Sequence, residues 1–422
     1  MTLSDMLLYA GLAATGTVAA AGGLRLIWHA IGLYRIRRAG PRTLRASRHV
    51  LWRDPGDVGR LDMSAGPGGP GSEPAPPFRF LEEHTTGSQP CVSVTDARQR
   101  VWRVKWGDEV RSENVAVRLA WACGYFAETT YFLPGGTIEG ATGLQRARSC
   151  IGEDCRFAEA RFELEDPAVR TMFEEHSWAW NDNPFVGTHE LHGLKILVML
   201  LSNWDTKDRR DVARGSNTAI FEHRISRRRR EARYLITDWG GSMGRWGGNI
   251  VTRGRWDPAG FAAQTPQFIT GVDGDTVTFG YAGQRTADVS TGIGIRDVAR
   301  LYRYLGRITD AQLRAALEAS GASAEDNAAF TQSLRDRIVQ LGRVCGAIAS
   351  AASPPESPAG SGERTRLNDR GTEQSRRKGR SARDASPRRR GDARRRAEKS
   401  QWVAPRSAPP HGTFRYSLRA PS

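Results

Sequence analysis

The sequence predicts an α+β fold with two lobes, preceded by an N-terminal transmembrane helix and followed by a disordered basic tail. Three observations lead to this prediction. An uncharged apolar run covers residues 6–24, the middle of the chain changes from strand-like to helical patterns, and large apolar residues become rare beyond about residue 350. With 39% hydrophobic residues among 422, the chain can bury one core of about 250 residues.

The run at 6–24 is about as long as a helix that crosses a bilayer. Arg25 ends it and further arginines follow, whereas Asp5 is the charged side chain before it. The positive-inside rule therefore predicts a single-pass anchor with the body of the protein in the cytoplasm. A cleaved signal peptide normally carries its positive charges before the apolar run, so a retained anchor is favoured over a cleaved signal or a soluble helix. Residues 1–53 are interpreted as this anchor and its basic juxtamembrane segment.

Two stretches have compositions that favour disorder. Residues 54–77 are rich in Gly and Pro and predict a flexible linker. Residues 351–422 hold 18 Lys and Arg against 7 Asp and Glu, so they carry +11 of the net charge of +16. Because the excess lies in one tail, the protein as a whole is not a basic nucleic-acid binder. The tail itself could contact an anionic membrane, remain a solubilising segment or bind nucleic acid, and the membrane is favoured.

Residues 78–186 are expected to form an N-lobe of strands around one helix. Apolar positions that end at Gly124 predict a helix over 113–124. The predicted strands are 78–81, 91–95, 101–106, 131–133 and 157–164.

Residues 187–350 are expected to form a mostly helical C-lobe. A buried helix is predicted over 191–201, and two strands at 218–225 and 234–237 follow it. Strands followed by helices are typical of an α+β fold with a cleft between two lobes. The remaining predicted helices are 295–308, 310–320 and 325–348.

Groups suited to phosphoryl transfer occur in a meaningful order along this region. Lys105 ends a strand, and Glu113 lies in the first turn of the next helix. The buried helix leads into Asn203-Trp-Asp-Thr-Lys-Asp, and a later strand leads into Asp238-Trp-Gly. A lysine paired with a carboxylate can hold phosphates, and two aspartates can orient a hydroxyl and bind Mg²⁺. Alone, each element has an ordinary explanation as an edge charge, a cap or a turn.

The order of these motifs resembles the protein-kinase-like superfamily, nearest its atypical members such as HipA-type kinases and phosphatidylinositol kinases. Asp205-Thr-Lys resembles the Asp-Leu-Lys of the kinase catalytic loop, and Asp238-Trp-Gly resembles Asp-Phe-Gly. The segments 102–105 and 183–191 and the Asn-Trp-Asp-x-Lys-Asp motif resemble those of an uncharacterised bacterial family. The resemblance covers roughly residues 78–345 and implies a two-lobed protein-kinase-like domain.

The resemblance implies a role for several residues. Lys105 would bind the phosphates of ATP, with Glu113 favoured over Glu109 as its ion-pair partner. Asp205 would be the base or the group that orients the hydroxyl, Lys207 would assist it, and Asp238 would bind Mg²⁺. The phosphate-covering loop would lie between the first two strands, with Thr86, Gly87 and Ser88 as its phosphate contacts.

One position departs from the kinase pattern. The residue five positions after the catalytic Asp is Asn in kinases and Arg210 here, and an arginine cannot bind Mg²⁺. Asn217 directly precedes the next predicted strand, as the metal-binding Asn does in kinases. A seven-residue insertion over 210–216 would therefore make Asn217 the second metal ligand. If it is not, the domain is a pseudokinase.

The expected function is an ATP- and Mg²⁺-dependent phosphotransferase that acts on Ser or Thr of a protein at the cytoplasmic face of the membrane. Two alternatives remain: a catalytically inactive, ATP-binding pseudokinase that serves as a membrane scaffold, and a kinase fold that transfers AMP. His189, His192 and His223 lack the spacing of a metal site and are expected to be structural.

Overall fold

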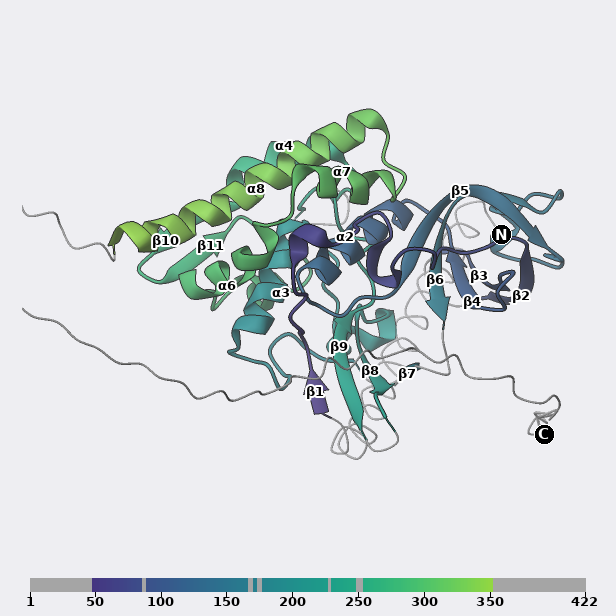
Figure 1. Cartoon of the computed structure of the whole chain (residues 1–422), viewed down its shortest axis with the longest axis horizontal. Helices are drawn as coiled ribbons and strands as arrows, with labels where there is room; N and C mark the ends of the chain where they lie inside the picture. Colours follow the sequence, from purple (N-terminus) through teal and green to yellow (C-terminus); the bar gives the residue numbers. More distant parts are fainter. Residues whose placement is uncertain are drawn as a thin grey trace, which may run out of the picture. The chain divides into compact units, whose positions relative to one another are not determined.

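The structure is a computed structural model that describes residues 48–85, 89–165, 170–172, 177–226, 229–247 and 253–351 (Figure 1). The expected anchor at 6–24 and the basic tail from 352 onward lie outside these residues. Among the helices of the described ranges, none is long and apolar enough to span a membrane. The fold is mixed α+β, as the sequence predicts.

Five strands of the N-terminal half close into a barrel in the order β2-β3-β4-β6-β5. The neighbours pair in antiparallel fashion except β2 and β5, which are parallel. Alternate side chains, including those of Trp102, Val104 and Phe162, point into the barrel and are inaccessible to solvent. Side chains between them in sequence therefore face outward, where a site can form. The strands are β2 (Phe78–His84), β3 (Cys91–Thr95), β4 (Val101–Lys105), β5 (Thr130–Glu139) and β6 (Arg156–Glu165).

Helix α2 (Val110–Ala122) joins this barrel to the rest of the molecule. It contacts β5 and β6 on one side and α7 (Asp310–Glu318) on the other. Its apolar side chains, such as Val115 and Leu119, belong to the core of the helical half. The position of α2 is therefore set by both halves of the fold.

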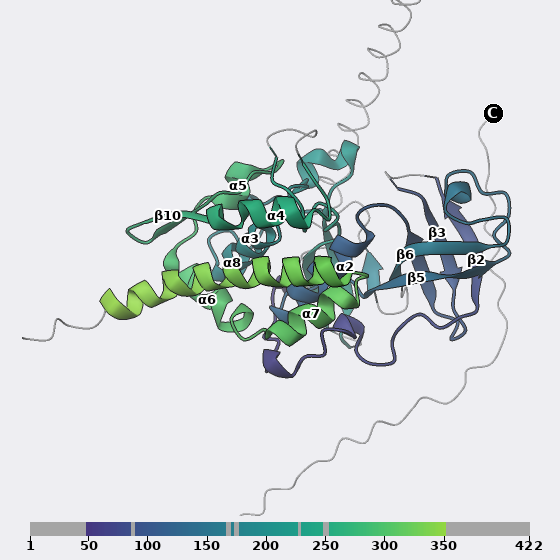
Figure 2. The same cartoon turned by 90° about the horizontal axis from the view of Figure 1, so that it is seen from above.

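The C-terminal half contains a four-stranded sheet, a hairpin and five helices in addition to α7. The sheet has the order β1-β9-β8-β7, in which β1 and β9 are parallel. Helix α8 (Ala324–Ala351) runs along the helical half (Figure 2) and contacts α4, α6 and α7. The other elements are β1 (Arg48–Val50), β7 (Arg170–Met172), β8 (Thr218–Arg224), β9 (Arg230–Ile236), β10 (Ile269–Asp273), β11 (Thr276–Phe279), α3 (His189–Leu200), α4 (Pro258–Gln264), α5 (Thr286–Ser290) and α6 (Ile295–Leu305).

The Gly/Pro segment 54–77 is not the flexible linker that its composition predicts. Val58 and Met63 are fully buried in it. The guanidinium of Arg118, buried in α2, donates to the backbone oxygens of Met63 (3.0 Å) and Ser64 (3.2 Å). A buried cation must have acceptors, and this segment supplies them, which explains why it is packed onto the domain.

The chain just before that segment is also tightly attached to α2. The backbone N–H of Arg53 donates to the carbonyl of Gly124 (2.9 Å), and the Trp52 indole donates to the carbonyl of Cys123 (2.8 Å). Gly124 has a φ of +88°, and a Cβ there would lie 2.3 Å from the Arg53 oxygen. Glycine is therefore required where α2 ends.

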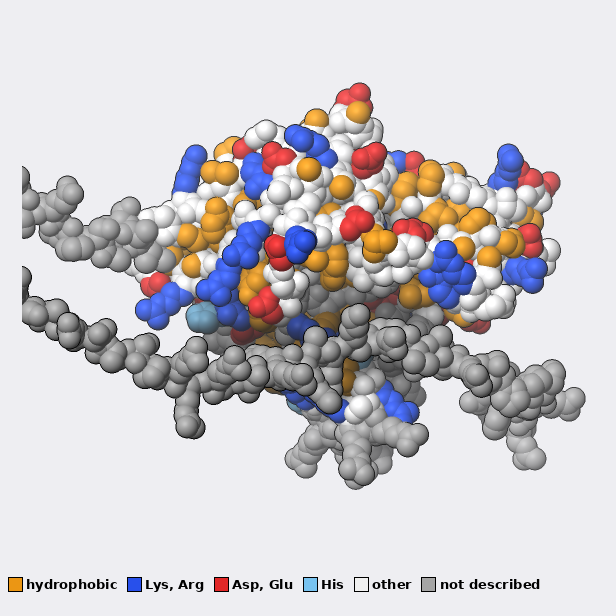
Figure 3. Space-filling model, viewed as in Figure 1, with side chains coloured by type: hydrophobic (Ala, Val, Ile, Leu, Met, Phe, Trp, Pro, Cys, Tyr) orange, Lys and Arg blue, Asp and Glu red, His pale blue; other side chains and the backbone are white. Residues whose placement is uncertain are grey.

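Charged side chains of both signs are interspersed over the face of the described region seen in Figure 3. This distribution agrees with the sequence, in which most of the net positive charge belongs to the tail.

Candidate functional site

Lys105 is the last residue of β4 and points outward from the barrel. Its Nζ contacts the carboxylates of Glu113, at 3.4 Å, and Glu109. The expectation that favoured Glu113 over Glu109 is therefore incomplete, because the turn after β4 brings Glu109 back onto the same amine. Burial lowers the pKa of Lys105, but the acidic neighbours Glu113 and Asp238 outweigh burial and raise it above its usual value.

Arg161 is a second cation at this position, and it was not singled out in the sequence. It lies on β6 directly opposite Lys105 in the strand register. Its guanidinium contacts Glu113 and, at 2.8 Å, Glu163. Burial raises the pKa of Glu113, while Arg161 and Lys105 oppose that rise. The outward-facing alternation on β6 was the signal that could have identified Arg161.

The loop that carries Asp205 follows α3, a helix that is buried along most of its length. Thr188 caps its N-terminus by accepting from the Leu191 N–H (3.3 Å). His189 and His192 bond Asp297 of α6 at 2.5 and 2.8 Å. These two histidines therefore connect α3 to α6, which is a structural role.

Asp205 lies in a buried polar environment and is 6% exposed. Its carboxylate contacts Lys207 (3.2 Å) and accepts from the Gln284 amide (2.5 Å), while its N–H donates to Asn203 (3.2 Å). Burial raises the pKa of Asp205, and Asp238 raises it further against the opposing charge of Lys207. Asp205 therefore accepts a proton more readily than an ordinary exposed aspartate does, as a catalytic base must. Gln284 comes from a region without any motif, so no local pattern pointed to this contact.

Asp238 follows β9 and is close enough to interact electrostatically with both Lys105 and Asp205. Its carboxylate accepts from the Gly240 N–H at 2.9 Å. Burial alone would raise the pKa of Asp238, but Lys105, the Gly240 N–H and Arg161 lower it below its usual value. Asp238 is therefore an ionised carboxylate, whereas the neighbouring Asp205 has a raised pKa.

The two glycines after Trp239 let the backbone pass between the two lobes. A Cβ on Gly240 would lie 2.7 Å from the Glu109 side chain, and one on Gly241 would lie 2.7 Å from Asn203 and 2.9 Å from the Asp205 N–H nitrogen. No real Cβ approaches other atoms so closely. The two glycines of Asp-Trp-Gly-Gly are therefore required because no side chain fits at their positions, whatever the role of Asp238 in metal binding.

Asn217 lies at the start of β8, beside both aspartates. Its amide Nδ2 donates to the backbone oxygen of Asp205 (2.5 Å), and its own carbonyl accepts from the Thr237 N–H (2.9 Å). Arg210 lies apart from it and binds Asp208 (2.8 Å) and Asp288 (2.7 Å). A 3₁₀ helix, Arg209–Arg214, covers most of the segment 210–216 where the insertion was expected.

The donor set suits a magnesium ion that is also held by phosphates. Mg²⁺ binds oxygen ligands and is often held by one or two protein carboxylates together with substrate phosphates and waters. Asp238 and Asn217 supply such oxygens. Burial and the neighbouring Asp238 both raise the pKa of Asp205, and a cation on Asp238 would relieve the repulsion between the two carboxylates. Within the described ranges, no group of three His, Cys, Asp or Glu residues could hold a metal by itself.

Three of the expected phosphate contacts, Thr86, Gly87 and Ser88, lie outside the described residues. The strands on either side of them, β2 and β3, are paired through Glu83–Val92 and His84–Cys91. The loop that contains them therefore joins these two strands, as expected.

Two arginines also stack on the ring of Trp204, an interaction that the sequence analysis did not predict. The guanidinium carbons of Arg253 and Arg255 lie 5.2 and 5.1 Å from the centre of its ring. Arg255 also lies 3.9 Å from Glu109. The segment after Asp-Trp-Gly therefore packs against the loop of Asp205, which the sequence could not show because stacking joins residues far apart in the chain.

No family model and no curated protein matches the chain. The chain is weakly similar to two crystal structures, both described as the Golgi casein kinase and one with Mn/ADP bound. The first is 9% identical, covers 70% of this chain and 78% of its own, and has a TM-score of 0.33. The second is 9% identical, with 71% and 80% covered and a TM-score of 0.31. The expected placement near HipA-type kinases stays a prediction, and at such low TM-scores we base the functional proposal on the side chains alone.

Proposed function

We propose that this chain is an ATP- and Mg²⁺-dependent phosphotransferase. The observation that carries the proposal is the meeting of Lys105, Asp205 and Asp238 in one partly buried cluster, although they come from strand β4, the loop after α3 and the segment after β9. Phosphoryl transfer needs a cation, a proton acceptor and metal-binding groups close together, because positioning and charge stabilisation supply most of the catalysis of this reaction.

Each group has a role in this reaction. Lys105, held by Glu109 and Glu113, would bind the phosphates of ATP. Asp238 and Asn217 would hold Mg²⁺, which neutralises charge on those phosphates. Asp205 would take the proton from a substrate hydroxyl while the oxygen of that hydroxyl bonds to the γ-phosphorus of ATP. The bond from that phosphorus to the β,γ-bridging oxygen breaks, and ADP leaves.

The finer parts of the proposal rest on the sequence. A Ser or Thr side chain of a protein is the proposed acceptor, and the expected anchor at 6–24 would hold the domain at the cytoplasmic face of the membrane. The arginine-rich tail would add contacts to anionic lipids.

Turnover and product mass test the proposal and separate it from its alternatives. Full-length protein is incubated with Mg²⁺-ATP and a mixture of protein substrates, and the modified products are weighed by mass spectrometry. A phosphoryl adduct supports the proposal, and an AMP adduct would assign the fold to AMP transfer. ATP binding without any product, in protein that melts cooperatively, would favour the pseudokinase.

Asp205→Asn is the matched variant for this experiment, and Asp154→Asn is its control. Asp154 has a largely exposed side chain far from the cluster in sequence. We expect Asp205→Asn to abolish turnover and keep ATP binding, since the phosphates are held by other residues. Wild-type turnover in Asp205→Asn would overturn the assignment of Asp205.

A further inference from the structure

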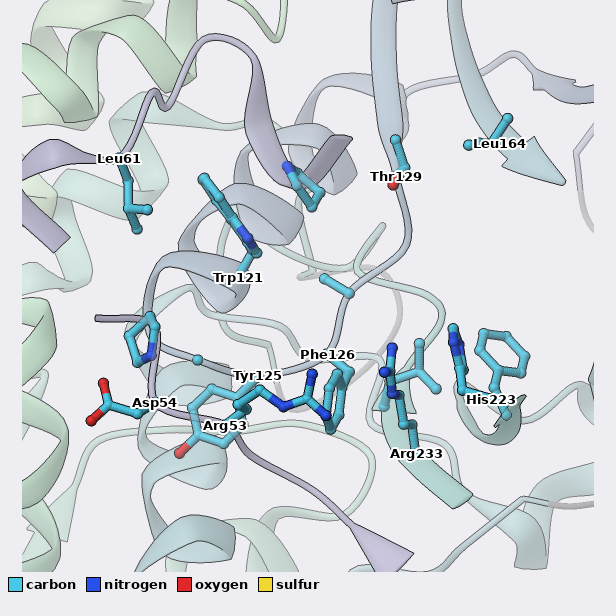
Figure 4. Close-up of a pocket in the computed structure, with 16 residues that line it drawn as sticks. Arg53, Asp54, Leu61, Trp121, Tyr125, Phe126, Thr129, Leu164, His223 and Arg233 are labelled. Carbon is cyan, nitrogen blue, oxygen red and sulfur yellow. The ribbon is translucent and has the colours of Figure 1, made fainter. Parts of the chain in front are cut away.

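A cavity of about 440 Å³ lies between three parts of the chain. The segment after β1 supplies Arg53 and Leu61, α2 and the segment after it supply Trp121 and Phe126, and β9 supplies Arg233 and Leu235. Figure 4 shows the first five of these residues around the cavity. This volume is within the range of pockets for small molecules. The cavity is lined by different residues from the cluster of Lys105, Asp205 and Asp238, so it is a separate site.

The cavity combines apolar walls with two arginines at one end. Figure 4 shows Phe126 between Arg53 and Arg233. The guanidinium carbons of Arg53 and Arg233 lie 5.6 and 4.7 Å from the centre of the Phe126 ring. The ring therefore holds two like charges close together, an arrangement that favours an anion between or beside them.

Among the residues that the structure describes, the ion pairs of these two arginines go to one carboxylate. Arg53 (2.8 Å), Arg233 (3.3 Å) and Arg229 (3.7 Å) all contact the single carboxylate of Glu231. Asp54 also lines the cavity, but its carboxylate points away from Phe126 (Figure 4) and accepts from the Gly56 N–H at 2.9 Å. One anionic group is therefore shared by three cations.

The pKa of Arg233 reflects the same imbalance. Burial lowers it, Glu231 raises it and the neighbouring Arg53 lowers it again, so that the result is a pKa below the usual value. A positive charge in that situation is stabilised by any further anion that reaches it.

We propose that this cavity binds a small amphipathic anion, with a flat apolar body and one carboxylate or phosphate group. The acidic group pairs with Arg53 and Arg233 in charge-assisted hydrogen bonds, and the apolar body lies against Trp121 and Leu235. The occupant contacts β9, whose next residues lead to Asp238, and the end of α2, whose first turn carries Glu113. The site is independent of the proposed function, because it needs neither ATP nor turnover.

Two probes that differ only in charge test the site. Naphthalene-1-carboxylate and its neutral carboxamide are titrated into the full-length protein, and binding is followed by saturation-transfer NMR of the probe. We expect the carboxylate to bind at least tenfold more tightly than the carboxamide. Equal binding of the two probes would overturn the proposal, and so would displacement of the carboxylate by Mg²⁺-ATP, since this would place the probe in the phosphotransfer cluster.

Substitution of single arginines locates the bound anion. We expect Arg233→Met to lower carboxylate binding to the level of the carboxamide, while Arg229→Met binds as the wild type does. Arg229 is the matched control because it shares Glu231 but does not line the cavity. If Arg233→Met does not melt cooperatively, Arg53→Met replaces it, since Arg53 has a half-exposed side chain. Wild-type binding in a folded variant of Arg233 or Arg53 would overturn the proposal.

Discussion

Lys105 on β4 and Arg161 on β6 are directly paired on neighbouring strands of the barrel, and both contact the buried carboxylate of Glu113. The first turn of α2 is therefore held by two cations from two strands. This arrangement fixes the helix more firmly than the single Lys–Glu pair that the sequence predicts. It also means that Lys105 can release Glu113 to bind phosphate without leaving that carboxylate unpaired.

Replacing Arg161 by Met should destabilise the fold strongly. The change leaves the buried carboxylates of Glu113 and Glu163 short of a partner, and breaking a buried ion pair costs about 3–5 kcal/mol. Urea denaturation of the purified protein measures the loss. Arg156→Met is the control: it lies on the same strand, is largely exposed, and should change stability by less than about 0.5 kcal/mol. Equal stabilities of the two variants would contradict the role assigned to Arg161.

Asp238→Asn should remove the magnesium-dependent part of ATP binding. When Mg²⁺-ATP is present at a hundred times its dissociation constant, binding should raise the free energy of unfolding of the wild type by about 2.7 kcal/mol. Melting curves with ATP alone and with Mg²⁺-ATP measure this gain. In Asp238→Asn, we expect the two curves to coincide, because the substitution removes the negative charge that holds the cation and leaves a neutral oxygen in its place. A magnesium-dependent shift as large as that of the wild type would exclude Asp238 as a metal ligand.

Asn217 and Arg210 should respond differently to substitution by Ala. Asn217→Ala removes a side-chain oxygen beside the two aspartates, so it should raise the Mg²⁺ concentration needed for turnover. Arg210→Ala removes a partner from Asp208, which is fully buried, so it should mainly lower the melting temperature. Turnover against Mg²⁺ concentration and thermal melting separate the two effects. An unchanged Mg²⁺ requirement in Asn217→Ala would show that the kinase-like asparagine is missing.

Gly241→Ala should impair turnover by displacing the loop of Asp205. The added methyl would lie 2.7 Å from the Asn203 side chain and 2.9 Å from the Asp205 nitrogen, and backbone atoms cannot move aside cheaply. Steady-state kinetics should show a lower kcat with little change in ATP affinity, since the three atoms nearest to the added methyl belong to Asn203 and Asp205 and not to Lys105, the proposed phosphate-binding residue. Gly59→Ala, where the nearest atom lies 3.5 Å away, is the control and should retain turnover.

The strands and helices that carry the candidate site were largely predictable. Alternation in β3 and β4, and helical spacing in α2 and α3, are local patterns, so the positions of Lys105, Glu113 and Asp205 along the chain followed from them. The hairpin β10–β11 was missed, because its short strands lack a long apolar run. Composition also misled at 54–77, where the need of buried Arg118 for carbonyl acceptors outweighs the flexibility of Gly and Pro.

Partners in the site that come from distant parts of the chain could not be predicted. Gln284 bonds Asp205 across 79 positions, and Arg161 reaches Glu113 only because β4 and β6 pair in one register. Both contacts depend on the path of the chain in space. Local sequence patterns contain no information about that path, although they identify the elements that it joins.

The pH dependence of turnover should report the carboxylate of Asp205. Burial and Asp238 raise its pKa above the usual value, while Lys207 lowers it. A base works only when ionised, so kcat/KM should be low in acid and rise as the pH increases through this raised pKa. In Lys207→Met the opposing positive charge is lost, so the acidic limb should move to higher pH, whereas Lys207→Arg should return it toward the wild-type position. Rate against pH for the three proteins, each confirmed as folded by its melting curve, measures the shift. An acidic limb at the same pH in all three would mean that a group other than Asp205 accepts the proton.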